Sequence, residues 1–337
     1  MDTGPAAKEG ATGPVAVQAD HGATDRAATL LDGLRGTHPS LVLIFGAQGD
    51  DLAGLQAQLA PGLPPDCIFA GCSSAGEIGP SGYASDSVVA IGFPRRHFRT
   101  ACLLLADLPS LPVSDWLRRL RRMAHDFAPA PDRRLFGLLL SDGLTGQEDV
   151  VVATLDAALP GVPVLGGSAG DGLRFRQTHL LGQGQVRSDV AVFLLVETDL
   201  AIHEVTFAHF SPTPVRAVVT AAQPERRRIL ELNAEPAALE YARLTGLDPA
   251  ALTPTEFARH PLLLRMGGRH HVRAISAITE DDGLSLMASV DTGTVLTLGR
   301  VEDLIQGFSD MLDALPGPPL MVLAFDCILR RLALERA

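Results

Sequence analysis

The stretches Leu41–Phe45 (LVLIF) and Gly71–Ile78 (GCSSAGEI) decide the fold of this 337-residue chain. A continuous apolar run is typical of a strand that is buried on both faces of a sheet. Leu52, Leu55 and Leu59 then follow at the spacing of one helix face. A short strand leads from this helix into GCSSAGEI, which we call the first glycine motif. The order predicts a strand-helix-strand unit of an α/β fold.

The same order of features returns later in the chain. The run Leu135–Leu140 (LFGLLL) precedes a second helical face, and a short strand then leads into Gly166–Asp171 (GGSAGD), the second glycine motif. The two glycine motifs begin 95 residues apart, and the two leading strands begin 94 residues apart. This agreement predicts an internal duplication, with copies at about 41–93 and 135–196.

The remaining sequence predicts the domain boundaries. Residues 1–23 are rich in Ala, Gly and Pro and lack apolar periodicity, which predicts a disordered tail. Residues 24–230 hold both copies and form the predicted α/β domain. Residues 231–337 mix helical segments, short strands and a Glu280–Gly283 turn, which predicts a smaller α+β domain. The predicted fold class is therefore α/β with internal duplication (two copies of a strand-helix-strand unit) followed by a smaller α+β domain.

Charge and hydropathy exclude several kinds of partner. The formal net charge of -11 disfavours binding to nucleic acid or to an anionic membrane surface, which both attract clustered Lys and Arg. The longest clean apolar run, Val190–Val196, is far too short to cross a bilayer. No basic, then apolar, export signal follows Met1. We expect a cytoplasmic protein with no nucleic-acid or membrane partner.

The glycine motifs are the first candidate binding site. Glycine permits close backbone approach, and the backbone N–H groups together with the hydroxyls of Ser73 and Ser74 suit a carboxylate or another anion. Glu77 suits an amine. A tight turn that only lets two elements pack is an equally good interpretation. The candidate ligand-binding residues here are Gly71, Cys72, Ser73, Ser74, Gly76, Glu77, Gly166, Gly167, Ser168, Gly170 and Asp171.

An enzyme is the main rival class. Gly166–Gly170 spells Gly-x-Ser-x-Gly, the nucleophile elbow of α/β hydrolases. The elbow requires a helix directly after its serine, whereas Leu173–Thr178 alternates like a strand. Cys72 would be a nucleophile only with a histidine nearby in space, and the second motif has Gly167 in its place. We expect no enzymatic activity and keep a serine or cysteine hydrolase as an alternative.

Two histidines are candidate metal ligands. His203, Val205, Phe207 and His209 share one face if this segment is a strand. Neutral imidazole is the usual axial ligand of haem iron, and an apolar pocket suits the macrocycle. A hydrogen-bonded, half-buried histidine is the plainer interpretation. If haem binds, His209 is the first axial candidate and His203 the second.

The end of the chain is the last candidate. The sequence Phe325–Arg331 (FDCILRR) follows a predicted closing strand at 320–325 and places an Asp beside two Arg. Such groups form charge-assisted networks, which serve either the structure or a ligand. From the second domain, the candidate ligand-binding residues are Arg273, Asp326 and Arg330.

Together these motifs resemble the FIST proteins. The resemblance rests on GCSSAGEI, on GGSAGD followed by Phe175–Thr178 (FRQT), and on FDCILRR, and it covers roughly residues 40–334. It implies a FIST N-like domain to about 230 and a FIST C-like domain beyond. It also implies an intracellular signal-transduction module that binds a small ligand, such as an amino acid or related metabolite, and signals through a separate partner protein.

One branch of the family gives a narrower expectation. His209–Thr213, Asn233–Pro236 and FDCILRR are similar to haem-containing nitric oxide sensors. That branch implies haem as the cofactor and a histidine kinase or a cyclic-di-GMP enzyme as the partner. Outside this branch the cofactor is unknown. A scaffold that binds no ligand is the third class to be tested.

Overall fold

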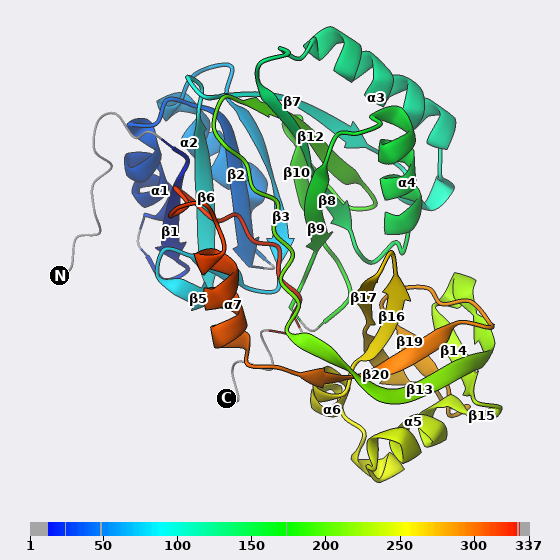
Figure 1. Ribbon diagram of the computed structural model, residues 1–337. Helices are drawn as coiled ribbons and strands as arrows, with labels where there is room; N and C mark the ends of the chain where they lie inside the picture. The colour runs from blue at the N-terminus through cyan, green and yellow to red at the C-terminus, as the bar shows by residue number, and fades with distance from the viewer. Residues whose placement is uncertain (1–12, 24, 48, 173, 329, 331–337) are drawn as a thin grey trace. The chain divides into compact units, whose positions relative to one another are not determined.

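The computed structural model describes residues 13–23, 25–47, 49–172, 174–328 and 330 (Figure 1). The chain divides into two compact units. Unit 1 runs to Ile202 and also includes Pro319–Phe325, while unit 2 comprises His203–Pro318 and resumes at Asp326. The larger first unit mixes helices with sheets, and the smaller second unit is built around one sheet.

Unit 1 contains two sheets whose strands follow the same order. The first has the order β1-β6-β2-β3, extended by β10 and β11, and the second has the order β7-β12-β8-β9. In each, the second strand pairs antiparallel with both neighbours, and the third pairs parallel with the fourth. The first sheet consists of β1 (Val15–Asp20), β2 (Pro39–Ala47), β3 (Ile68–Ser74), β6 (Ser87–Pro94), β10 (Leu180–Gly182) and β11 (Gln185–Arg187). The second consists of β7 (Phe98–Leu105), β8 (Arg134–Asp142), β9 (Val164–Ala169) and β12 (Ala191–Thr198).

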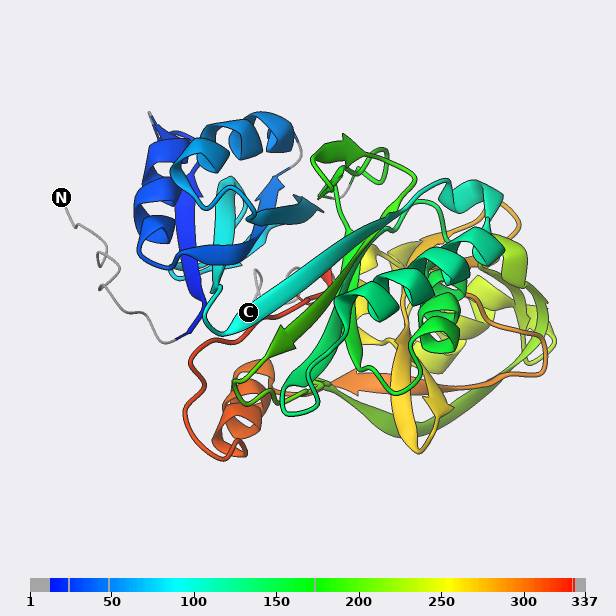
Figure 2. The same cartoon turned by 90° about the horizontal axis from the view of Figure 1, so that it is seen from above.

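Helices cover the outer face of each sheet. The helices are α1 (Arg26–Arg35), α2 (Leu52–Leu59), α3 (Val113–Phe127) and α4 (Glu148–Ala158). α1 and α2 share a core with the first sheet, and α3 and α4 share one with the second. Figure 2 shows α1 and α2 in blue against their own sheet and α3 in teal along the other. A small hairpin of β4 (Glu77–Gly79) and β5 (Gly82–Ala84) follows β3.

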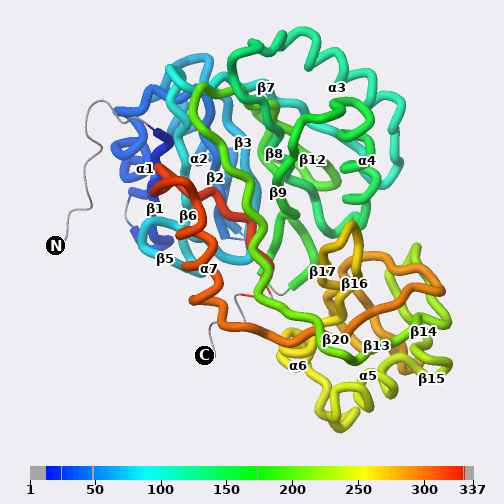
Figure 3. The backbone as a smooth tube through the Cα atoms, in the orientation of Figure 1, coloured from blue at the N-terminus to red at the C-terminus, as the bar shows by residue number. Residues whose placement is uncertain are grey.

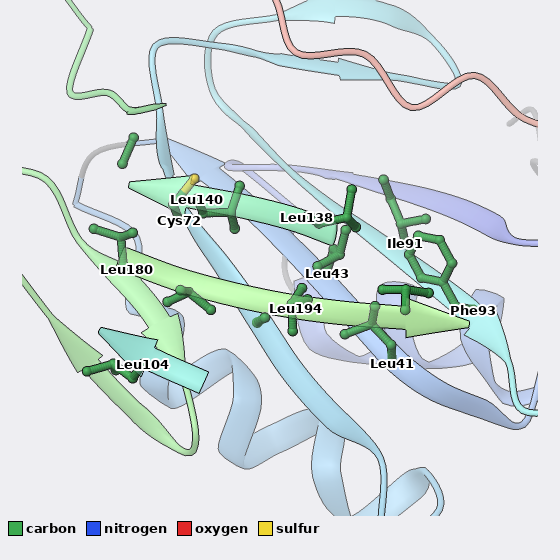
Figure 4. Packing of buried hydrophobic residues seen from close by; sticks show 14 of the residues in the cluster. Leu41, Leu43, Cys72, Ile91, Phe93, Leu104, Leu138, Leu140, Leu180 and Leu194 are labelled. Carbon is green, nitrogen blue, oxygen red and sulfur yellow. The ribbon is translucent and has the colours of Figure 1, made fainter. Parts of the chain in front are cut away.

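The inner faces of the two sheets form the central core of unit 1. Leu41 and Leu43 face this core together with Leu138 and Leu194 (Figure 4). The alternate residues of β2 pack under α1 and α2 instead. The run LVLIF is therefore buried on both faces, as its continuous apolar character predicts. We refer to the core between the sheets as the inter-sheet core.

The predicted tail is wrong for residues 15–20, because they form β1. This strand pairs antiparallel with β6, from Val15 opposite Gly92 to Asp20 opposite Ser87. An edge strand takes its hydrogen bonds from a neighbour that lies far away in the sequence. Its own composition therefore did not reveal it.

The predicted closing strand at 320–325 is also wrong. Within the described part of the chain, this segment is extended but pairs with no strand. Met321, Leu323 and Phe325 pack against the inter-sheet core, so alternate side chains face inward as they would in a strand. Figure 3 shows the segment in red beside the strands of unit 1.

Unit 2 is built on a sheet with the order β17-β16-β20-β13-β14-β19-β18, and β15 pairs with β14. Its strands are β13 (Phe210–Gln223), β14 (Arg228–Leu232), β15 (Glu235–Pro236), β16 (Leu262–Met266), β17 (Arg269–Arg273), β18 (Ile275–Ile278), β19 (Leu284–Leu286) and β20 (Val295–Val301). Its helices are α5 (Ala237–Thr245), α6 (Pro254–Arg259) and α7 (Leu304–Asp313). Tyr241 and Phe257 anchor its core.

The second unit begins earlier than the predicted boundary at 231. It starts at His203, because the long strand β13 pairs with β20 and β14 of the second unit. The short 3-10 turn Pro224–Arg226 lies inside this unit, between β13 and β14. The predicted turn at Glu280–Gly283 is confirmed, since it joins the antiparallel pair β18 and β19.

Candidate functional site

Glycine is required at the same register position in both parallel strand pairs of unit 1. Gly71 lies opposite Ile44, and Gly166 lies opposite Leu139. A Cβ atom on Gly71 would lie 1.9 Å from the Ile44 carbonyl oxygen, and one on Gly166 would lie 1.8 Å from that of Leu139. No side chain fits at those distances, so these two glycines serve the close approach of neighbouring backbones.

The two glycine motifs meet within unit 1. The backbone N–H of Gly170 donates to the carbonyl oxygen of Ser73 at 3.0 Å. Ser73 is in turn tied to His179, whose N–H donates to the Ser73 Oγ at 3.0 Å and whose carbonyl accepts from the Ser73 N–H at 2.8 Å. The motifs therefore lie side by side at the carboxyl ends of β3 and β9, which belong to different sheets. Ligands of open α/β sheets favour the carboxyl ends of strands.

Glu77 is the buried carboxyl group of the first motif. Only 2% of the residue is exposed. Its Oε1 accepts from the Ser74 Oγ at 2.6 Å, and its Oε2 accepts from the Ser87 Oγ at 3.1 Å. Burial raises the pKa of Glu77, these hydroxyl hydrogen bonds oppose the rise, and the charge of Asp50 adds to it. The Ser74 hydroxyl also accepts from the Gly76 N–H at 3.0 Å, so it is already engaged inside the turn.

Asp171 is the buried carboxylate of the second motif. It accepts from the backbone N–H groups of Phe175, Arg176 and Gln177 at 2.7, 2.6 and 3.0 Å. Burial opposes its charge, but these three hydrogen bonds and the nearby Arg174 hold the pKa of Asp171 below its ordinary value. The chain wraps around this carboxylate as a loop. The prediction that this stretch alternates like a strand is therefore wrong for its described residues, 174–178.

The two candidate nucleophiles lie in different settings. Cys72 faces the inter-sheet core (Figure 4), and burial raises the pKa of its thiol to about 12. It is therefore a protonated thiol at neutral pH. Ser168 is exposed on β9, its Oγ donates to the Glu148 Oε1 at 3.3 Å, and a loop rather than a helix follows it. Gly167, beside it, faces the ring of Phe325.

In unit 2 the structure brings His209, Asp326 and Arg330 together. The Arg330 Nε donates to the His209 Nδ1 at 3.1 Å, and the Arg330 Nη2 donates to the Phe207 carbonyl oxygen at 3.1 Å. The Arg330 Nη1 pairs with the Asp326 Oδ1 at 2.8 Å. The guanidinium also lies over the Phe207 ring, 4.9 Å from its centre. Phe210 packs on the His209 ring, with the two ring centroids 3.7 Å apart. Asp326 and Arg330 thus form part of the predicted charge network, to which the structure adds His209, while the second arginine, Arg331, lies outside the described residues.

The predicted pairing of His203 with His209 on one strand face is wrong. Residues 201–209 form no strand, and β13 begins only at Phe210. His203 is exposed, whereas His209 is 3% exposed. Arg273 ends β17, where its Nη1 donates to the Val272 carbonyl oxygen at 3.3 Å. Among the described residues, no cluster of three or more His, Cys, Asp or Glu is arranged to hold a metal ion.

Sequence reasoning missed three residues of these sites: Ser87, His179 and Phe207. Ser87 had a signal, because it belongs to the Ser85–Ser87 stretch whose Ser-Asp pair recurs as Ser188-Asp189. His179 had none, because it contributes backbone atoms that any residue carries. Phe207 was noted only as a neighbour of the histidines, and its role depends on the distant Arg330.

The fold and these sites define a two-unit α/β protein with paired glycine motifs in its larger unit. Residues 40–235 match the FIST N domain, and residues 237–337 match the FIST C domain. The chain therefore belongs to the FIST family, whose domains are associated with signal transduction and small-ligand sensing. A comparison with curated proteins gives no match. In the part of the chain that is described, no helix has the length and hydropathy needed to cross a membrane.

Proposed function

We propose that this protein is a small-ligand sensor whose ligand binds where the two glycine motifs meet, and that a separate signalling protein detects the bound state. The hydrogen bond from Gly170 to Ser73 supports this most directly, because it joins motifs that lie far apart in the sequence. Edges formed by the carboxyl ends of strands are the usual ligand sites of α/β sheets. The family's association with sensing agrees with this assignment.

An internal duplication is part of this proposal. The two sheets share their strand order, and each parallel pair places a glycine opposite the same position of its neighbour. Duplicated loops that lie side by side would present two related surfaces to one ligand. A zwitterion such as an amino acid suits such a pair, with Glu77 receiving the amine, and Ser73, Ser74 and the backbone N–H groups receiving the carboxylate.

The hydrogen bonds of the first motif suggest how binding is signalled. Ser74 donates to Glu77 and accepts from Gly76, so the turn is closed on itself. A ligand that replaces either bond has a different affinity for the closed and the open turn. Such a difference is what shifts a conformational equilibrium. The remaining candidates of the two motifs stay proposed contacts of this ligand, while Arg273, Asp326 and Arg330 stay candidate ligand-binding residues of unit 2.

The proposal is tested by thermal-shift measurements with each common amino acid and related metabolites, followed by affinity measurements on variants. Gly170→Val is expected to weaken binding at least tenfold, because a Cβ there would lie 3.1 Å from the Ala75 nitrogen and would push the motifs apart. Gly22→Val is the control, since no atom lies within 4 Å of its Cβ position. Unchanged affinity in a folded Gly170→Val protein would reject this site. A chain that no compound stabilises would support the scaffold class.

The hydrolase alternative keeps its own test. Labelling by a fluorophosphonate probe that disappears in Ser168→Ala, or by iodoacetamide that disappears in Cys72→Ala, would favour an enzyme. We expect neither, because the Cys72 thiol is buried and protonated and Ser168 is paired with Glu148.

A further inference from the structure

The hydrogen bond between Arg330 and His209 fixes which nitrogen of the imidazole is protonated. The Arg330 Nε donates to the His209 Nδ1 at 3.1 Å. A guanidinium has five N–H donors and no acceptor, so the His209 Nδ1 must present its lone pair. The proton of a neutral imidazole must then reside on Nε2.

The surroundings of His209 also keep the ring neutral. Burial, followed by the charge of Arg330, lowers the pKa of His209 to about 4, against an opposing effect of the Asp326 charge. The ring therefore has a single proton at neutral pH. Phe210 packs on this ring, and Phe207 stacks at a centroid distance of 6.1 Å.

We infer that Arg330 holds His209 as the neutral Nε2–H tautomer, so that His209 anchors Arg330 and is excluded from ligating haem iron. An axial histidine ligates through an Nε2 lone pair while its Nδ1–H donates to an acceptor. In this protein the roles of the two ring nitrogens are reversed, because the His209 Nδ1 accepts the hydrogen bond. The His209 Nδ1 cannot ligate iron in place of Nε2, since its lone pair already accepts the Arg330 N–H. His209 as it is held here does not fit a haem.

Arg330 has the contacts of a positioning residue. It joins His209 to Asp326 through the ion pair at 2.8 Å, and it joins the segment before β13 through the Phe207 carbonyl and ring. One guanidinium thus connects two parts of unit 2 that lie 121 residues apart in the sequence. This inference does not depend on the proposed ligand site in unit 1.

The first test is the long-range ¹H–¹⁵N spectrum of the histidine rings in the ¹⁵N-labelled full chain at neutral pH. The His209 signals are assigned by their loss in His209→Gln. We expect a protonated-type Nε2 and an unprotonated-type Nδ1 in the unmodified protein. A protonated Nδ1 would overturn the inference. This result requires only that the variant used for assignment, His209→Gln, folds.

Variants of Arg330 separate positioning from a general structural role. Arg330→Met keeps an apolar stem but removes the donor, so the His209 signals should move toward a mixture of tautomers. Arg330→Lys restores an N–H donor and should restore the Nε2–H form. Arg265→Met, at an exposed position of β16, is the matched control and should leave the His209 signals in place. A folded Arg330→Met protein with unchanged tautomer signals would contradict the role of Arg330.

The second test is haem titration followed by visible absorption. The unmodified protein and His209→Gln should give the same spectrum, whether or not haem associates elsewhere. A Soret band that shifts or disappears in a folded His209→Gln protein would overturn the inference. In Arg330→Met, a Soret shift that depends on His209 would support it, because the imidazole is then released to take the tautomer that iron requires.

Discussion

The two sheets of unit 1 have the same strand order, but the buried carboxyl groups of their glycine motifs have pKa values that are shifted in opposite directions. In the first glycine motif, Glu77 accepts hydrogen bonds from hydroxyls, and burial raises its pKa. In the second, Asp171 accepts three backbone N–H bonds, and its pKa is lowered. Two sheets with the same strand order therefore lead into one carboxyl group that resists ionisation and one that favours it.

The difference separates what the backbone requires from what the side chains decide. The close approach of parallel strands requires Gly71 and Gly166 equally. The charge state depends on how many donors the following loop supplies. The shared strand order is therefore a property of packing, whereas the chemistry of each motif is local to its own loop. The predictions below test each half of this comparison.

The largest expected effect tests what the two sheets share. Gly71→Ala and Gly166→Ala should each destabilise the protein by about 3 kcal/mol or more, because the new Cβ overlaps a carbonyl oxygen of the neighbouring strand. Urea unfolding measures the loss. Gly22→Ala is the control and should stay within about 0.5 kcal/mol of the unmodified protein. A large effect at only one of the two glycines would contradict their equivalence.

The next effect concerns the ionised carboxyl group. Asp171→Asn should cost about 2 kcal/mol at neutral pH, because hydrogen bonds to a charged acceptor are lost. The pKa of Asp171 is lowered in the folded state, so its contribution is complete above the ordinary pKa and is lost as the pH falls through the folded value. Urea unfolding at several pH values should show the gap between the two proteins closing below about pH 4. A gap that does not depend on pH would contradict the role of charge.

For Glu77→Gln, the difference in stability from the unmodified protein should change with pH in the opposite direction. The folded pKa of Glu77 is raised, so the unmodified protein loses stability as the pH rises from the ordinary pKa toward the folded value. The loss is roughly 1.4 kcal/mol for each unit of the rise. The glutamine cannot ionise, so the variant should gain stability relative to the unmodified protein as the pH rises above the ordinary pKa of glutamate, as followed by thermal unfolding. A variant that becomes relatively weaker over this range would contradict the assignment.

The smallest effects separate two serines at equivalent places. Ser73→Ala should cost about 1 kcal/mol, because the partly buried His179 N–H loses its acceptor. Ser168→Ala should change stability by less than about 0.5 kcal/mol, because Ser168 is exposed. Paired urea titrations measure the difference. Equal costs would show that the Ser168–Glu148 bond matters as much as the Ser73 bond.

Two features of the sequence predicted structure well because they act locally. The run Leu41–Phe45 has no polar residue and is bounded by turn signals, so a strand buried on both faces suits it. The turn at Glu280–Gly283 supplies the Asp and Gly that tight turns use, and Asp282 adopts a φ of 54° there. Neither feature needs a distant partner to be recognised.

Three predictions are wrong because the structure of each segment depends on a partner outside that segment. The segment 203–209 alternates like a strand but has no strand partner among the described residues, so its backbone stays irregular. Residues 174–178 also alternate, but the Asp171 carboxylate takes the N–H groups that a ladder would have used. Residues 15–20 look like a tail but find a partner in β6. A strand depends on a neighbour that the local sequence does not contain.

The sequence by itself determined the strands and helices around the glycine motifs, the recurrence of these motifs and the membership of the FIST family, because periodicity and motif spacing are local properties of the chain. Only the tertiary structure decided that Gly170 bonds to Ser73 and that Arg330 bonds to His209. The pKa directions of Glu77 and Asp171 were decided in the same way. The physical reason is that a protonation state depends on burial and on donors in three dimensions, and residues far apart in the sequence supply both.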